Sequence, residues 1–98
     1  PGARAFLKAY REAYGVSDPD PYSIFGYEAM KLGLDTIASL GSRGDQRSAV
    51  LAALFSVRGR HSVIGTYGFD RHGDTTLRSY GVYRVGAHGL LVFERNAL

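Results

Sequence analysis

The chain has 98 residues, a formal net charge of +3 and 45% hydrophobic residues, including seven Tyr and five Phe. This length allows one domain at most, and this hydrophobic content is typical of a folded chain. The absence of cysteine excludes a disulfide framework, a thiolate metal site and a cysteine nucleophile, and the scattered basic residues do not favour a nucleic-acid partner.

The first predicted element is an amphipathic helix over residues 3–14. Three aromatic residues recur at every fourth position, which is the spacing of one helix face. They are Phe6, Tyr10 and Tyr14. Gly15 is the expected C-cap. The stretch 17–21 contains two prolines and therefore predicts a short, stiff connector.

A second helix is expected from about Tyr22 to Leu40. Asp20 is a suitable N-cap, Pro21 suits the first helical position, and Gly41 should end the helix. An apolar face and a strip of small residues suggest packing on two sides, with close backbone approach at the strip. The apolar face comprises Tyr27, Met30, Leu34, Ile37 and Ala38, and the small strip comprises Gly26, Ala29 and Gly33.

The remaining pattern predicts a third helix and then strands. The helix should span residues 46–57, with Asp45 as its N-cap. Its expected inward side chains are Val50, Leu51, Leu54 and Phe55. A short strand at 63–69, a polar turn at 70–74 and a hairpin with strands at 79–85 and 90–93 follow.

These elements predict the α/β class: three helices followed by a short strand and a C-terminal β-hairpin. Three helices with apolar faces require more sheet than about three strands provide. The pattern therefore indicates a single partial domain over residues 1–98, with further residues expected upstream of Pro1.

Four sequence motifs occur in a fixed order along nearly the whole chain. They are Phe6-x3-Tyr10-x3-Tyr14-Gly15, Pro19-x-Pro21-Tyr22-x4-Tyr27-x-Ala29, Gly65-x2-Gly68-x-Asp70-x2-Gly73-Asp74 and Tyr83-x-Val85-x3-Gly89. Together they resemble the C-terminal part of leucine/isoleucine/valine-binding-type proteins. Those proteins are the substrate-binding components of branched-chain amino acid ABC transporters and have the two-lobed type I periplasmic binding protein fold.

The resemblance implies a division of this chain between two lobes. Residues 1–76 would belong to the N-terminal lobe, 77–81 to a hinge crossing, and 82–98 to a hairpin of the C-terminal lobe. It also implies an extracytoplasmic location, a small-molecule ligand such as an amino acid, and a membrane permease as partner. Tyr22 and Ile24 would be ligand-wall residues. The main amino-acid anchors of the family lie upstream, so we expect this piece to be unable to bind ligand alone.

The sequence offers no convincing catalytic, cofactor or metal site. No two of the three histidines have metal-ligand spacing on a helix, and we expect them to be solvated. They are His61, His72 and His88. Asp70 and Asp74 lack the further oxygen ligands of a calcium loop and are expected to form a tight turn. None of the serines lies in a nucleophile elbow, so an enzyme is not predicted.

Two other hypotheses remain open from the sequence. Apolar helix faces without a covering sheet promote association, which suggests a small self-associating interaction module. This hypothesis includes a homodimer that forms by exchange of the C-terminal hairpin beyond residues 75–81. Alternatively, the chain belongs to a ligand-sensing regulator built on the same binding fold.

Overall fold

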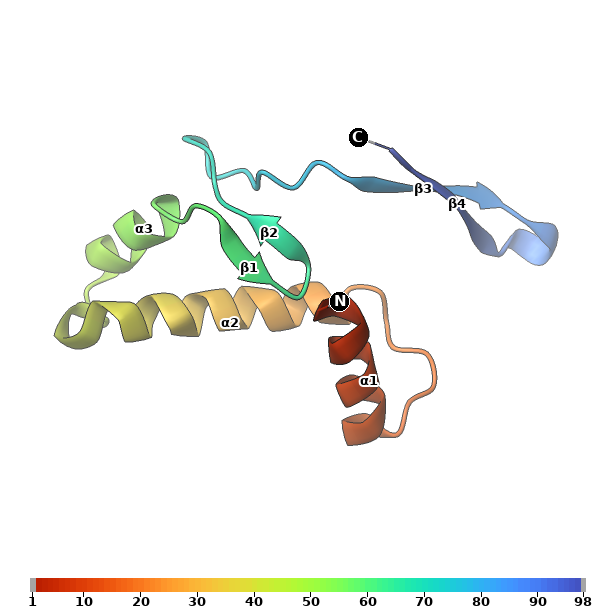
Figure 1. Ribbon diagram of the computed structural model, residues 1–98, viewed down its shortest axis with the longest axis horizontal. Coiled ribbons are helices and arrows are strands. Elements are labelled where there is room, and N and C mark those ends of the chain that lie inside the picture. The colour runs from red at the N-terminus through yellow and green to blue at the C-terminus, as the bar shows by residue number, and fades with distance from the viewer. Residues whose placement is uncertain (1, 98) are drawn as a thin grey trace.

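The computed structural model describes residues 2–97 of the chain as three α-helices followed by two antiparallel β-hairpins (Figure 1). The helices are α1 (Gly2–Tyr14), α2 (Ser23–Leu40) and α3 (Arg47–Phe55). The strands are β1 (Arg60–Ser62), β2 (Gly65–Tyr67), β3 (Tyr80–Val85) and β4 (Leu91–Ala97). The short 3-10 helices are η1 (Gly41–Arg43) and η2 (Ala87–Gly89). The predicted α/β order of elements is confirmed.

Helix α2 is the longest element of residues 2–76, which we call the body. The β1–β2 hairpin and α3 lie along one side of it, while α1 crosses it near its N-terminal end (Figure 1). The well-buried apolar side chains include Ala49 of α3 and Tyr67 of β2. Glu28 and Thr36 of α2 are buried beside them. The core is therefore small, and a polar face of α2 contributes to it.

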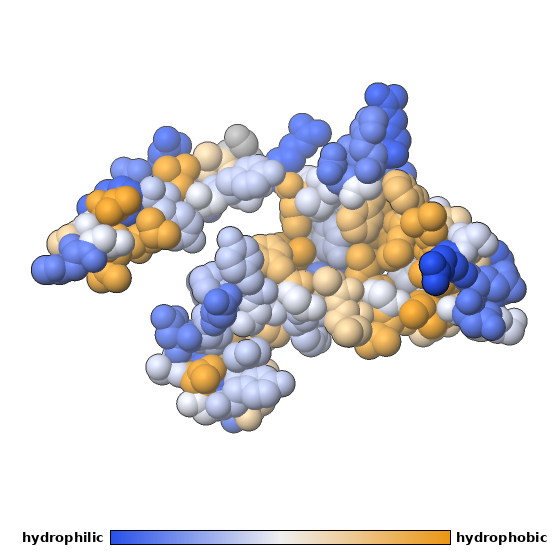
Figure 2. Space-filling model, turned by 180° about the vertical axis from the view of Figure 1, so that it is seen from behind, coloured by the Kyte–Doolittle hydropathy of each residue, from blue (hydrophilic) through white to orange (hydrophobic). Residues whose placement is uncertain are grey.

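The apolar face predicted for α2 does not point into this core. Tyr27 meets α1 through a ring contact with Phe6, with centroids 5.1 Å apart. Met30 and Leu34, further along, are 66% and 58% exposed. The prediction that this face packs within the chain is therefore wrong beyond Tyr27, because β1–β2 and α3 pack on the opposite face, where Glu28 lies. Apolar residues accordingly reach the surface of the molecule (Figure 2).

The strip of small residues on α2 also lacks the expected close neighbour. A Cβ built at Gly26 or Gly33 would meet nothing within 4 Å among the described residues. Ala29 is exposed as well. The expectation of close backbone approach is wrong for the residues described, because no element lies over this side of the helix.

The N-terminus of α2 is set by a turn rather than by the predicted cap. The Tyr22 backbone N–H donates to the Asp20 carboxylate at 2.8 Å, and the Ser23 N–H donates to the Asp20 carbonyl at 3.0 Å. These bonds close a turn over Pro21, and Tyr22 occupies the N-cap position without a side-chain bond. Asp20 is therefore not the N-cap and Pro21 is not the first helical residue, because the turn delays the helix to Ser23.

The observed helix ends match the predicted ones at the two glycines but not at α3. Gly15 and Gly41 end α1 and α2 with φ of 65° and 56°, as predicted. At α3 the N-cap is Gln46 rather than Asp45, and the helix ends at Phe55. Two predicted inward residues of α3 are exposed. They are Leu51 and Phe55.

The short strand predicted at 63–69 is confirmed in part, because β2 occupies Gly65–Tyr67 within it, but the chain turns just before β2 and the preceding strand β1 was not predicted. Strands β1 and β2 pair as Arg60 with Tyr67, His61 with Thr66 and Ser62 with Gly65. The Ser62 hydroxyl donates to the Gly65 carbonyl at 2.8 Å and accepts the Ile64 N–H at 3.2 Å. These two bonds, with Gly65 at a φ of 123°, stabilise the turn.

The second hairpin extends away from the body, and we call its residues 80–97 the arm (Figure 1). The predicted hairpin is confirmed, although β4 continues to Ala97 instead of ending at Phe93. The radius of gyration is 16.6 Å, whereas a compact chain of this length would have about 13 Å. The arm and body are thus loosely joined.

Two glycines are expected to respond in opposite ways to alanine. Gly68 is buried, and an added Cβ would lie 2.6 Å from the Val57 carbonyl oxygen. Gly68→Ala should therefore lower the free energy of unfolding by about 1–3 kcal/mol. Gly26→Ala is the control, because the helix interior there is open and alanine should stabilise it by up to about 1 kcal/mol. Urea unfolding followed by circular dichroism measures both, and equal effects would contradict the packing described.

Candidate ligand-binding cavity

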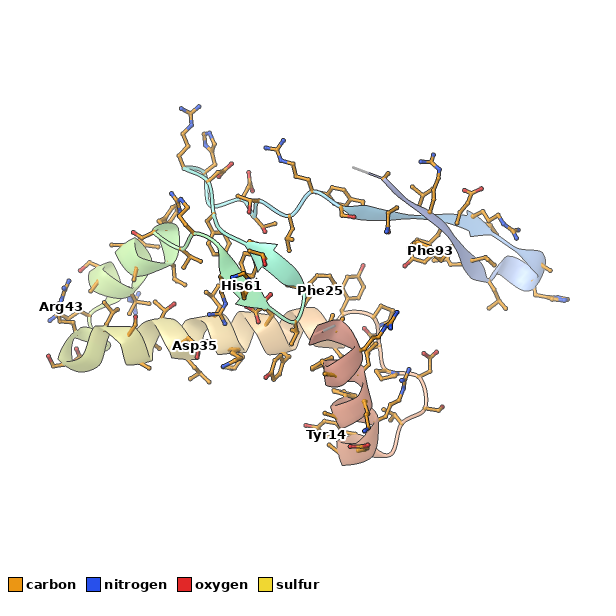
Figure 3. The ribbon with its side chains drawn as sticks, in the orientation of Figure 1. Tyr14, Phe25, Asp35, Arg43, His61 and Phe93 are labelled. Carbon is orange, nitrogen blue, oxygen red and sulfur yellow. The ribbon has the colours of Figure 1, made fainter. Side chains whose placement is uncertain are left out.

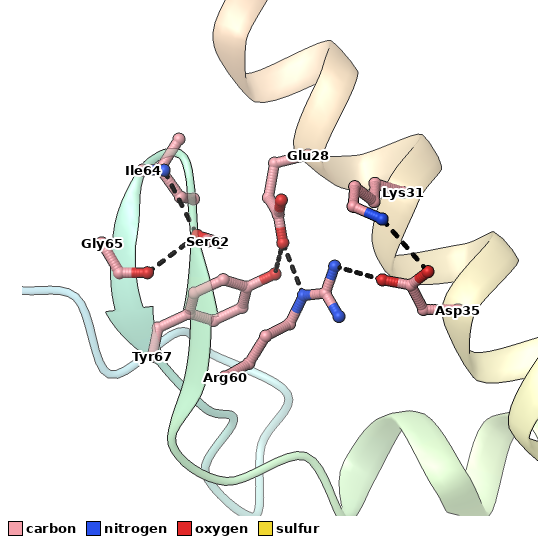
Figure 4. A network of polar contacts seen from close by, with 8 residues as sticks. All are labelled: Glu28, Lys31, Asp35, Arg60, Ser62, Ile64, Gly65 and Tyr67. Carbon is pink, nitrogen blue, oxygen red and sulfur yellow. Dashed lines mark hydrogen bonds and ion pairs between the residues drawn. The ribbon is translucent and has the colours of Figure 1, made fainter. Parts of the chain in front are cut away.

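A buried carboxylate on α2 receives two hydrogen bonds from the β1–β2 hairpin (Figure 4). Glu28 Oε1 accepts from Arg60 Nε at 2.6 Å and from the Tyr67 hydroxyl at 2.8 Å. Arg60 Nη2 also donates to Asp35 Oδ2 at 2.9 Å, and Lys31 Nζ donates to Asp35 Oδ1 at 3.3 Å. We call these five residues the α2–hairpin network.

The α2–hairpin network balances its own charge. Two carboxylates face one guanidinium and one ammonium group, and every buried side-chain nitrogen or oxygen within residues 2–97 has a hydrogen-bond partner. The bond from Arg60 holds the pKa of Asp35 below its usual value. Burial, reinforced by the bond to Glu28, raises the pKa of Tyr67 to about 12. The network is therefore neutral overall, with Tyr67 protonated at ordinary pH.

A cavity of about 560 Å³ borders this network. It is bounded by the first turns of α2, the β1–β2 hairpin and the segment that leads to the arm. Its walls include Ile24, Phe25, Ile64, Phe69 and Leu77, and Glu28 and Tyr67 also line it. Apolar walls with a few polar groups are the usual composition of a small-molecule site.

The structure places the two predicted ligand-wall residues differently. Ile24 lies one helical turn before Glu28 on the same face of α2 and lines the cavity. Tyr22 is 78% exposed and is not part of the cavity wall. Its ring centroid lies 6.2 Å from that of Phe25, which lines the cavity. The ligand-wall role of both residues stays a prediction.

Sequence reasoning missed the polar residues of the site. Glu28 and Asp35 are seven positions apart, which places them on one helix face opposite the apolar one. This spacing was a usable signal, but a charged helix face is normally solvated. The pairing of Arg60 with Tyr67 across a hairpin was not foreseen, because the predicted strand began at residue 63 and no strand was predicted at Arg60.

The predicted polar turn after β2 is confirmed. Asp70 Oδ1 accepts the backbone N–H groups of His72 at 2.8 Å and Asp74 at 3.0 Å, and Gly73 has a φ of 87°. These backbone bonds hold the pKa of Asp70 below its usual value.

Of the three histidines considered as metal ligands, His61 lies in β1, where its Nδ1 is 2.9 Å from the Thr66 hydroxyl. No group of three potential metal ligands occurs within the described part of the chain.

Comparison with known proteins gives one match. Residues 1–89 match the family model described as periplasmic binding protein. No curated protein and no solved structure matches the chain. Among residues 2–97, none of the helices combines the length and hydrophobicity that a membrane crossing requires.

The Arg60–Glu28 pair should dominate the stability of the body. Arg60→Met leaves the Glu28 carboxylate buried without its cation, so we expect a loss of about 3–5 kcal/mol in unfolding free energy. Replacing both residues, as Arg60→Met with Glu28→Leu, should recover most of this loss. Asp35→Asn is the matched control, because Asp35 is 45% exposed and its loss should cost about 1 kcal/mol or less. Equal stability of the single and double variants in urea unfolding would refute this account.

The raised pKa of Tyr67 predicts a defined alkaline transition. Its ordinary pKa is 10.0 and its folded pKa is about 12. The folded state therefore favours the protonated phenol, and this stabilisation is complete below pH 10 and is lost as the pH rises towards 12. Unfolding free energy should fall more steeply over this interval in the parent than in Tyr67→Phe. Tyr14→Phe, an exposed control, should behave like the parent, and identical slopes in all three would contradict the prediction.

Proposed function

The chain belongs to the periplasmic binding protein family, and from that premise we propose that it forms part of the solute-binding component of an ABC transporter. Proteins of this family are normally not enzymes. The proposed ligand is a branched-chain amino acid or a similar small polar molecule. The proposed location is the periplasm or the outer face of the cell envelope, where the loaded protein would deliver its ligand to a membrane permease.

The division into lobes is part of this proposal. Residues 1–76 would contribute to the N-terminal lobe, 77–81 to a hinge crossing and 82–98 to the C-terminal lobe. Two observations support the division. Thr76 is hydrogen-bonded to Gly68 in both directions, at 2.9 and 3.0 Å, which ties the connector to the body. Residues 77–79 then lead to the arm without regular secondary structure.

The cavity beside Ile24 carries the proposal of ligand capture. It opens between the body and the segment proposed as a hinge, which is where a ligand held between two lobes would lie. Its apolar walls suit an aliphatic side chain, and its polar floor already has its charges paired. The groups that hold the α-carboxylate and α-ammonium of an amino acid would therefore come from other parts of the whole protein. We accordingly propose that this chain alone binds ligand weakly or not at all.

A second candidate function is protein association. It is favoured by the exposed apolar face of α2, where Met30, Leu34 and Ile37 are 66%, 58% and 45% exposed. The two candidates are compatible, because one concerns the cavity and the other the opposite face of α2.

Calorimetry tests the primary proposal. The protein encoded by the complete reading frame that contains this chain should bind at least one member of a panel of amino acids, amides and small carboxylates. The 98-residue chain, titrated beside it, should give much weaker heat or none. Absence of binding by the complete protein to the whole panel would refute the transport proposal.

Substitutions in the complete protein test the assigned wall residues. Ile24→Ala and Tyr22→Ala should each weaken binding of the best ligand roughly tenfold or more, since an apolar side chain buried against a ligand contributes about 1.5–3 kcal/mol. Ser42→Ala is the control, because Ser42 lies at the opposite end of α2, in η1. If Ile24→Ala and Ser42→Ala bind equally well, the cavity is not the ligand site.

A further inference from the structure

The segment after the polar turn is fastened to the end of β2 by two reciprocal hydrogen bonds. The Thr76 backbone N–H donates to the Gly68 carbonyl at 3.0 Å, and the Gly68 N–H donates to the Thr76 hydroxyl oxygen at 2.9 Å. We call this pair of bonds the 68–76 clasp. One of its two acceptors is a side-chain hydroxyl, so the clasp depends on the identity of residue 76 as well as on the backbone.

The body holds its own half of the clasp closely. Gly68 is buried, and an added Cβ there would lie 2.6 Å from the Val57 carbonyl oxygen. The next residue, Phe69, donates its N–H to the same carbonyl at 3.1 Å and forms an isolated antiparallel bridge with Thr75. The Gly68 backbone therefore has little room to move, and its buried N–H requires an acceptor.

The residue that follows the clasp reaches the candidate ligand cavity. Leu77 is half-buried and lines the cavity together with Ile24, whereas residues 78–80 are exposed. The Leu77 N–H donates to the Thr75 hydroxyl at 3.2 Å. Its Cδ2 atom would lie 3.4 Å from a Cβ built at Gly65, so the leucine packs against the turn of the β1–β2 hairpin.

The cavity walls differ in how they are held. Figure 3 shows one wall residue, Phe25, at the N-terminal end of α2. That residue is fixed by the backbone hydrogen bonds of a helix. Leu77 belongs to neither a helix nor a strand. Its place in the wall is therefore set by the hydrogen bonds of its own segment.

We propose that Thr76 is a positioning residue of the ligand cavity, because its hydroxyl, through the 68–76 clasp, holds Leu77 in the cavity wall. The inference rests on the proposed function, since it takes this cavity to be the ligand site. Thr76 is exposed and does not line the cavity, so its effect on a ligand passes through Leu77. A wall that is in place before the ligand arrives lowers the cost of binding.

Thiol accessibility tests the positioning step without a ligand. The chain has no cysteine, so Leu77→Cys introduces a single thiol whose rate of reaction with a maleimide reports the exposure of residue 77. Adding Thr76→Val keeps the shape of the side chain but removes the acceptor of the Gly68 N–H, and should raise this rate at least about threefold. Thr76→Ser keeps the hydroxyl and should change the rate less than about twofold. Equal rates with valine and with serine would overturn the proposal.

A second threonine of the hairpin provides the matched control. The Thr66 hydroxyl is 2.9 Å from His61 Nδ1 in an exposed part of the β1–β2 hairpin. Thr66→Val, added to Leu77→Cys, should therefore leave the thiol reaction rate unchanged. Circular dichroism establishes that the variants are folded. An effect of Thr66→Val as large as that of Thr76→Val would indicate general loosening of the hairpin and would overturn the assignment to the clasp.

A double-mutant cycle in the complete protein tests the link to the ligand. With the best ligand of the calorimetry panel, Leu77→Ala should weaken binding about tenfold, and Thr76→Val should weaken it at least about threefold. Because Thr76 acts through Leu77, adding Thr76→Val to Leu77→Ala should weaken binding by less than about a further twofold. Effects that multiply in the double variant would show that Thr76 acts independently of Leu77 and would overturn the proposal.

The two proposals fail in different ways. If the complete protein binds no member of the panel, the proposed function fails, while the thiol reaction rates still decide whether Thr76 positions Leu77. If the complete protein binds a ligand and its affinity is unchanged by Thr76→Val and by Leu77→Ala, the positioning role is refuted and the proposed function stands.

Discussion

The ion pair between Arg60 and Glu28 is the constraint on which the body depends. Arg60 Nε and Glu28 Oε1 lie 2.6 Å apart, although the two residues are 32 positions apart in the sequence. The Tyr67 hydroxyl donates a second hydrogen bond to the same carboxylate oxygen. A buried carboxylate is costly unless it is paired and hydrogen-bonded. The β1–β2 hairpin must therefore lie over the face of α2 that carries Glu28. Since few apolar side chains are buried, this polar contact specifies the arrangement more than the hydrophobic core does.

The position of the hairpin determines what both faces of α2 can do. On the Glu28 side, Ile24 lines a cavity in which the charge of Glu28 is already paired with Arg60. On the other side, the Met30 and Leu34 side chains are 66% and 58% exposed. The same contact thus determines which face of α2 is covered and which stays exposed. The family assignment is the reason for proposing a ligand at the first surface.

The arm is a hairpin separate from the β1–β2 hairpin of the body. Its strands pair with one another and extend away from the body (Figure 1). Residues 77–79 connect this hairpin to the body without regular secondary structure. In a two-lobed binding protein such a connector allows the lobes to close on a ligand.

The sequence by itself determined the element types, the glycine ends at Gly15 and Gly41, the arm hairpin and the family resemblance, because these follow from local periodicity, turn chemistry and ordered motifs. It predicted one cavity residue, Ile24, but not Glu28 or Tyr67. Only the tertiary structure decided which face of α2 is covered and where β1 turns into β2. The first outcome depends on the partner of a single buried charge, and a long-range pairing of this kind leaves no periodic trace in the sequence.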